Sequence, residues 1–273
     1  MELRAGANWR PTRIERVNRV LSTSTKPLHV MTDKGAALVK YMGNRAGLDS
    51  LVSELLAGEL ASKLELQTPD FAIVDIPSIE TGDPFVTVQP GPAFFSRWEQ
   101  AQSLAPNSRL LASLRRPADV SRLVVFDTWI RNKDRFADDP NGTLLNYDNI
   151  LFKADIRKTQ LLVIDHSHAF AETSLEAEMD DDWANERVVY GLFNEFQPML
   201  KRRDVKSAID MVSALDVEEL RTICQSPPAQ WGITTGAADR MAELLSERAK
   251  LMSEWVPDAI FAQMELNLDG KED

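Results

Sequence analysis

The stretch from Leu123 to Phe170, LVVFDTWIRNKDRFADDPNGTLLNYDNILFKADIRKTQLLVIDHSHAF, decides the fold of this chain. Its first apolar residues recur at spacings of three and four, which predicts a buried helix that ends near Arg131. Two short apolar runs follow, NILF and LLVID, and both have the length and composition of strands. Three polar residues stand at the ends of these elements: Asp134, Asn149 and Asp165.

Antiparallel pairing of the two runs predicts a hairpin whose turn is centred near Arg157. This register places Asn149 opposite Asp165 at the open end of the hairpin, and Asp134 reaches the same end from the preceding loop. Two carboxylates and an amide held together suit a magnesium-bound phosphate. Asp and Asn also occur constantly in turns and at strand ends, so spacing alone leaves that alternative equally open.

Composition narrows the class of protein. The chain has 273 residues, with 42 Asp and Glu against 31 Lys and Arg and a net charge of -11. An acidic balance argues against a general nucleic-acid binder, because attraction to phosphate needs clustered cations. The single cysteine, Cys224, fits a reducing cytoplasm. No signal-peptide pattern and no apolar run of membrane-spanning length is present, so we expect a soluble cytoplasmic protein.

The first ninety residues predict a small sheet with one helix. A strand over 14–21 leads into the polar loop STSTKP, whose hydroxyls are Ser22, Thr23, Ser24 and Thr25, and the strand LHVM follows. Such a loop could bind an anion, although a solvated hairpin loop is the commoner outcome. The runs FAIVDI and FVTVQ predict further strands, and Pro90-Gly91-Pro92 then ends the sheet. This places a lobe boundary after residue 90, with an N-lobe over 1–90 and a mainly helical C-lobe over 91–273.

Lys40 is the unusual residue of this predicted sheet. It lies in a strand whose two faces are both apolar, and a buried ammonium needs an anionic partner. The following helix, 48–66, offers Glu54 and Glu59. Glu59 lies nearer the middle of the apolar stripe, so periodicity slightly favours Glu59, while either glutamate could simply be exposed.

Taken in order, these features resemble the HipA-like kinases, which have a two-lobed, α+β protein-kinase-like fold. The resemblance rests on LVKYMGN, SELLAGELASKLELQTPD, NKDRF, NYDNILF and VIDHSHAF, and it covers about residues 15 to 170. It implies a small, mainly β N-lobe with one helix and a larger, mainly helical C-lobe. It also implies an ATP- and Mg²⁺-dependent kinase, most simply one that acts on protein Ser or Thr.

The resemblance assigns a role to each matching position. Asp134 matches the catalytic-loop aspartate, which accepts the proton of the substrate hydroxyl. Asn149 and Asp165 match the residues that bind the metal. Lys40 matches the strand lysine on the ATP phosphates, and the alignment of SKLELQTPD with the family's helix end favours Glu54 as its partner.

Two further segments receive roles in nucleotide binding. The loop of Ser22, Thr23, Ser24 and Thr25 matches the phosphate-covering loop, in which members of this family phosphorylate a serine. The stretch of Val88, Gln89 and Gly91 is expected to form the hinge beside adenine. The implied partners are a protein substrate and an antitoxin-like protein, with no direct contact to nucleic acid or membrane.

The sequence also departs from the family pattern. The catalytic aspartate and the metal-binding asparagine are fifteen residues apart rather than five, which indicates an inserted loop over 136–147, and Phe136 replaces a common histidine. These departures favour, as one alternative, a nucleotide-binding pseudokinase that acts as an interaction module. His166 and His168 beside Asp165 suggest a second, a metal-dependent hydrolase, which the lack of an HExxH motif argues against.

Overall fold

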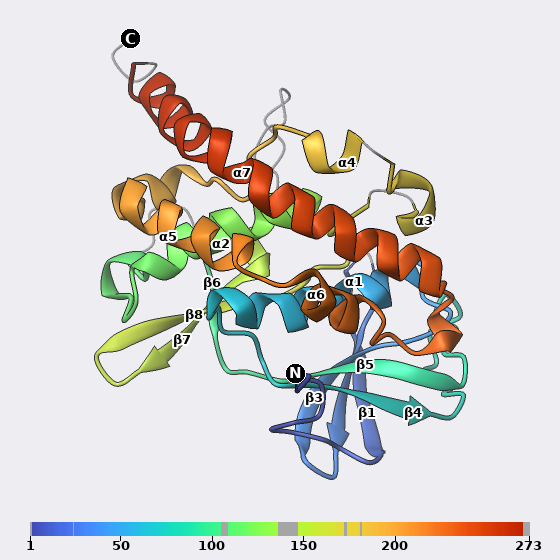
Figure 1. The fold of residues 1–273 in the computed structure, drawn as a ribbon. Helices are drawn as coiled ribbons and strands as arrows, with labels where there is room; N and C mark the ends of the chain where they lie inside the picture. Colours follow the sequence, from blue (N-terminus) through green and yellow to red (C-terminus); the bar gives the residue numbers. More distant parts are fainter. Residues whose placement is uncertain are drawn as a thin grey trace.

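The computed structural model describes residues 2–23, 25–104, 109–135, 147–171, 174–180 and 182–269. An antiparallel sheet formed by the N-terminal part of the chain lies against a larger helical part, and the long helix α7 runs across the helical part from near the end of β5 toward the C-terminus (Figure 1). This division confirms the predicted α+β architecture.

The N-terminal sheet has five strands in the order β1-β2-β3-β5-β4, and all neighbours are antiparallel. Helix α1 packs between this sheet and α6, which explains why nearly every one of its residues is buried. The elements are β1 (Ile14–Val20), β2 (Leu28–Thr32), β3 (Gly35–Lys40), α1 (Asp49–Ala61), the 3₁₀ helix η1 (Ser62–Leu64), β4 (Phe71–Ile76) and β5 (Gly91–Arg97).

The sheet does not end where the sequence predicts. Residues 85–89 form no strand and contribute only an isolated bridge between Ile79 and Val88. The last strand is instead β5, which the predicted lobe boundary after residue 90 separates from its neighbours β3 and β4. Pro92 is tolerated in β5 because the first residues of this strand pair only with β4, whereas pairing with β3 begins at Phe94.

A second sheet begins the C-terminal part, in the order β6-β7-β8, with β6 (Gln102–Ser103), β7 (Ile150–Asp155) and β8 (Lys158–Val163). The pair of Asp155 with Lys158 brackets a two-residue turn that contains Arg157, so the predicted hairpin is confirmed. Its register differs by one residue from the prediction. Ile150 pairs with Val163, which places Asn149 opposite Ile164 rather than Asp165.

The remaining elements are helical. Helix α7 contacts α2, α4, α5 and α6, and their apolar side chains share one core with α1. None of the helices in the described ranges is both long and apolar enough to cross a membrane. The helices are η2 (Leu111–Ser113), α2 (Ala118–Trp129), η3 (Lys133–Arg135), η4 (Tyr147–Asn149), α3 (Leu175–Glu178), α4 (Asp182–Asn185), η5 (Asn194–Met199), α5 (Arg202–Ser213), α6 (Val217–Cys224), η6 (Ala229–Trp231) and α7 (Thr235–Asp269).

Candidate functional site

Lys40, the last residue of β3, is the centre of a polar cluster between the sheet and the helical part. Its ammonium Nζ lies 2.5 Å from Glu54 Oε1 on α1 and 2.7 Å from Asp165 Oδ1, just after β8. It also lies 2.7 Å from Ser167 Oγ. Lys40, Glu54 and Ser167 are buried and Asp165 is half-buried, so three separate segments bring one cation, two carboxylates and a hydroxyl together with little access to water.

Electrostatics favour the ionised forms of two of these groups. Burial alone would lower the pKa of Lys40, but the carboxylates of Asp165 and Glu54 outweigh burial and raise it. Burial would raise the pKa of Asp165, and the Lys40 ammonium together with the Ser167 hydroxyl holds it well below its usual range. The pKa of Glu54 is raised by burial, with Asp165 acting in the same direction. The pKa of each ionisable group in this cluster therefore depends on the charges of the other two.

The structure resolves the choice between the two glutamates of α1. Glu54 accepts hydrogen bonds from Lys40, from Ser167 Oγ and from the backbone N–H of His166. Glu59 is also buried, but its oxygens accept the backbone N–H groups of Arg4 and Ala5, each at 2.8 Å. The apolar stripe that favoured Glu59 reflects its burial beneath the N-terminal segment rather than a partnership with Lys40.

Asp134 lies in the 3₁₀ helix η3, next to the start of the hairpin. Asn149 Nδ2 donates to Asp134 Oδ2 at 3.5 Å, so these two predicted site residues meet. Burial raises the pKa of Asp134; positive charge at His168 opposes this, and the nearby Asp165 adds to it. A carboxylate of raised pKa is the better proton acceptor, which suits a general base.

Arg135 fixes the geometry of this region, and sequence reasoning did not single it out. Its fully buried guanidinium forms a bidentate pair with Asp127 of α2, with both distances 2.8 Å. It also donates to the backbone carbonyls of Asn149 and Ile164, at 3.1 and 2.8 Å. One side chain thus joins the loop of Asp134 to α2 and to both strands at the open end of the hairpin. The sequence feature that could have indicated Arg135 is Asp127, a carboxylate among the apolar residues of a buried helix, because such a carboxylate needs a cationic partner.

The predicted phosphate-covering loop connects β1 to β2 above the Lys40 end of the sheet. Leu21 N donates to Pro27 O at 2.9 Å, and Tyr41 Oη donates to Lys26 O at 3.1 Å, which closes the loop. Lys26 Nζ in turn pairs with Asp83 at 3.0 Å. Of the four predicted hydroxyl residues, Ser22 and Thr23 are exposed, Thr25 is buried, and Ser24 lies outside the described residues.

The predicted hinge is not where the two parts of the chain connect. Val88 and Gln89 precede β5, Gly91 is its first residue, and Gln89 N donates to Met42 O at 2.9 Å. The connection to the second sheet follows β5 instead, at residues 98–101. There Trp98 N donates to Ala36 O, and the Trp98 ring packs on His29 with centroids 4.5 Å apart. The Pro-Gly-Pro run therefore does not end the sheet, and the role of Val88, Gln89 and Gly91 beside adenine stays a prediction.

The oxygen atoms available here suit magnesium. Asp165, Asn149 and Asp134 offer carboxylate and amide oxygens, which are the ligands that this hard cation prefers. Within the described ranges, no group of three or more His, Cys, Asp and Glu side chains is placed to hold a metal ion alone. Magnesium is usually bound through one or two carboxylates together with substrate phosphates, and Asp165 and Asp134 offer such carboxylates. Residues 136–146 of the predicted insertion, including Phe136, lie outside the described residues.

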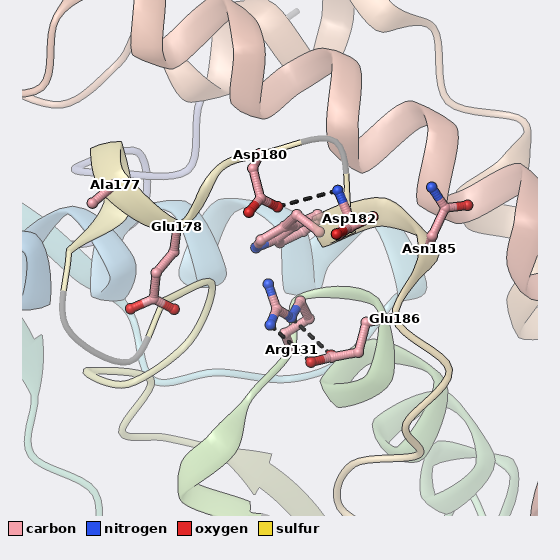
Figure 2. Close-up of a pocket in the computed structure, with 8 residues that line it drawn as sticks. Arg131, Ala177, Glu178, Asp180, Asp182, Asn185 and Glu186 are labelled. Atoms are coloured by element: carbon pink, nitrogen blue, oxygen red, sulfur yellow. Dashed lines mark hydrogen bonds and ion pairs between the residues drawn. The ribbon is translucent and has the colours of Figure 1, made fainter.

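A cavity of about 530 Å³ is lined by Arg131, which precedes the loop of Asp134, and by side chains of α3, α4 and the residues beside them (Figure 2). Arg131 and Glu186 point toward each other on one side of it, and Glu178, Asp180 and Asp182 lie on the other. Glu178 Oε2 lies 3.9 Å from Lys133 Nζ, next to Asp134 in the sequence. The wall of the cavity is therefore connected to the loop that carries Asp134.

Comparison with known proteins gives a family and a structural neighbour. A family model described as HipA-like kinase matches residues 14–261. Among solved structures, the Helicobacter pylori proinflammatory kinase CtkA is similar, with a TM-score of 0.55 and 10% sequence identity over 93% of this chain and 96% of that chain. At that identity the likeness concerns the fold alone. No curated protein matches.

Proposed function

Because the chain belongs to the HipA-like kinase family, we propose that it transfers the γ-phosphate of ATP, with magnesium, to a Ser or Thr hydroxyl of a protein. The observation that carries this proposal is the cluster of Lys40, Glu54 and Asp165, assembled from the sheet, α1 and the end of β8. Phosphoryl transfer requires cations and metal ligands at fixed positions, and this cluster supplies both at the Lys40 end of the sheet.

Each residue has one task in the proposed reaction. Glu54 holds the Lys40 ammonium, which neutralises charge on the ATP phosphates. Asp165 and Asn149 would hold the magnesium ion, which would supply positive charge to stabilise the phosphates. Asp134 accepts the proton of the acceptor hydroxyl while the acceptor oxygen bonds to the γ-phosphorus and the bond to the β–γ bridging oxygen breaks, leaving ADP. Arg135 keeps Asp134 and Asn149 at a constant separation.

The acceptor, the partner and the location are part of the proposal. We take the acceptor to be a protein, including Ser22 or Ser24 of the chain's own loop, and an antitoxin-like protein remains a candidate partner. Exposure of Ser22 supports modification in the loop, because a kinase can reach only an accessible hydroxyl. The single cysteine supports a cytoplasmic location, because a chain with one cysteine has no internal disulfide that would need an oxidising compartment.

The decisive experiment incubates the purified protein with labelled ATP and magnesium, alone and with candidate protein acceptors. We expect label on the protein or on an acceptor, and we expect Asp134→Ala to abolish the transfer. Asp75→Ala, an exposed carboxylate of β4, serves as the matched control and should label like wild type. Equal labelling by the Asp134 variant would exclude Asp134 as the base, and ATP binding without any transfer would select the pseudokinase.

A further inference from the structure

Arg248, in the middle of α7, is a fully buried cation that the proposed chemistry does not use. Its Nε and Nη2 donate to Thr128 O, at 3.0 and 2.9 Å. Its Nη1 lies 2.7 Å from Glu186 O and 3.3 Å from the carbonyls of Trp183 and Ala184. One guanidinium therefore binds four backbone carbonyls from two distant segments.

These carbonyls belong to the ends of two helices. Thr128 is the penultimate residue of α2, and Trp183 and Ala184 lie in the single turn of α4. The last carbonyls of a helix lack partners within the helix and carry partial negative charge, so a cation there is favourable. Arg248 satisfies both ends at once and fixes their separation.

The two ends that Arg248 joins flank the candidate site. The chain leaves α2 directly into the loop of Asp134, and α4 belongs to the wall of the cavity in Figure 2. Glu186 connects them a second time, because its carboxylate takes a bidentate pair from Arg131 with both distances 2.8 Å. Arg248 Nη2 lies 3.9 Å from the same carboxylate.

An aromatic ring completes this joint. The Trp183 ring has the Arg131 guanidinium at 5.3 Å and the Arg248 guanidinium at 5.7 Å, distances typical of cation–π contacts. Trp183, Arg131 and Glu186 all line the cavity, so all three residues that Arg248 organises contribute to its wall. A shift of Arg248 would move this wall relative to Asp134.

The guanidinium is costly where it lies. Burial lowers the pKa of Arg248 to about 10, although Glu186 acts in the opposite direction. A buried cation is often less stabilising than an apolar side chain of similar volume, so core packing alone does not explain an arginine here. The five donors in a planar fork are what this joint uses, and lysine or methionine could not reproduce them.

We propose that Arg248 is a positioning residue that sets residues 182–186, a part of the cavity wall that we take as the acceptor side, against the loop of Asp134. The role in catalysis rests on the proposed kinase function, whereas the positioning itself does not. It follows that loss of the fork loosens both segments and weakens binding of the acceptor, while the distant nucleotide-binding cluster around Lys40 is unaffected.

The test compares Arg248→Lys with wild type, and with Arg240→Lys as the same substitution elsewhere on α7. Amide hydrogen exchange is followed in peptides over 128–135 and 182–191, with 28–40 in the sheet as the internal reference. For Arg248→Lys we expect exchange about tenfold faster in the first two peptides and unchanged in the third. In phosphate transfer we expect the KM for the acceptor to rise several-fold and the KM for ATP to stay constant.

Uniformly faster exchange throughout the helical part would overturn the proposal, because Arg248 would then be an ordinary core residue. Unchanged exchange in all three peptides would overturn it as well. If Arg248→Lys does not fold, Glu186→Gln tests the same joint through the pair of Glu186 with Arg131. We then expect faster amide exchange in the peptide 128–135 and unchanged exchange in the peptide 28–40. A wild-type protein without phosphate transfer would refute the proposed function, yet the exchange pattern would still decide the positioning.

Discussion

Lys40 and Asp165 are separated by 125 residues, yet Lys40 Nζ donates a hydrogen bond to Asp165 Oδ1 over 2.7 Å. This contact joins the last residue of β3 to the segment that follows β8, and therefore the N-terminal sheet to the helical part. Because Glu54 on α1 holds the same ammonium, the lysine connects two carboxylates that would otherwise repel each other. Stability and the proposed chemistry thus depend on the same three side chains.

Replacing Lys40 by methionine should destabilise the protein strongly. Lys40→Met leaves Glu54 buried beside Asp165 without a cation, and breaking a buried ion pair in this way costs about 3 kcal/mol or more. Urea denaturation measures the change in the free energy of unfolding. Lys34→Met, an exposed lysine of the turn between β2 and β3, is the control and should change that free energy by less than about 0.5 kcal/mol. Similar losses in both variants would contradict a structural role for the ammonium.

The pH dependence of phosphate transfer should report the raised pKa of Asp134. A general base must be ionised, so kcat/KM is expected to fall as the pH drops through the pKa of Asp134, at a pH above the ordinary aspartate range. His168→Gln removes the side chain whose electrostatic effect lowers the pKa of Asp134, so the acid limb should move to higher pH. The measurement is the pH profile of kcat/KM for both proteins, with Asp134→Asn as the inactive reference. An acid limb that does not move would rule out His168 as a neighbour that tunes the base.

The sequence was sufficient for features with a local signal. Hydrophobic periodicity predicts the hairpin that ends near Asn149 and Asp165, and a lysine in a strand with two apolar faces predicts a buried ion pair. The family pattern identifies Glu54 where periodicity favours Glu59, because a helical wheel reports burial without saying what lies opposite. Ser167 carried no such signal, because its contact with Lys40 forms only when the end of β3 and the segment after β8 come together.

The errors have a common cause in tertiary context. Pro90-Gly91-Pro92 reads as a break, but β5 begins there because the sheet leaves one side of its first residues unpaired. For the same reason the predicted hinge lies at the start of β5, whereas the connection to the second sheet follows Arg97. Arg248 could not be found from sequence, since an arginine on an amphipathic helix is normally exposed, and its four carbonyl partners come from segments more than 60 residues away.

Acid should destabilise the protein in part through Asp165. Because the pKa of Asp165 is lowered in the folded state, its contribution to stability is fully present above the unfolded pKa of about 4 and is lost as the pH falls through the lower folded value. The free energy of unfolding of wild type should therefore fall more steeply below about pH 4 than that of Asp165→Asn. Urea denaturation at a series of pH values measures both slopes. Asp75→Asn, at an exposed position of β4, should keep the wild-type slope, and a parallel pair of curves for Asp165→Asn would contradict the prediction.

Gly191 should be the least replaceable glycine of the site. Its φ is +70°, its N–H donates to Arg135 O at 2.9 Å, and a Cβ at this position would lie 2.4 Å from Asp127 Oδ2. Gly82 has nearly the same φ, +77°, but a Cβ there meets nothing within 4 Å. The two alanine variants therefore share the backbone strain of about 1–2 kcal/mol and differ only in the collision with Asp127.

Gly191→Ala must push Asp127 away from Arg135, which breaks the fully buried pair that holds the Asp134 loop. We expect it to lower the free energy of unfolding by at least about 2 kcal/mol more than Gly82→Ala does, since disruption of a buried pair costs about 3–5 kcal/mol. Urea denaturation of the two variants gives this difference directly. Equal losses would mean that Asp127 moves aside without releasing Arg135, and the loop of Asp134 would then not depend on this pair for its position.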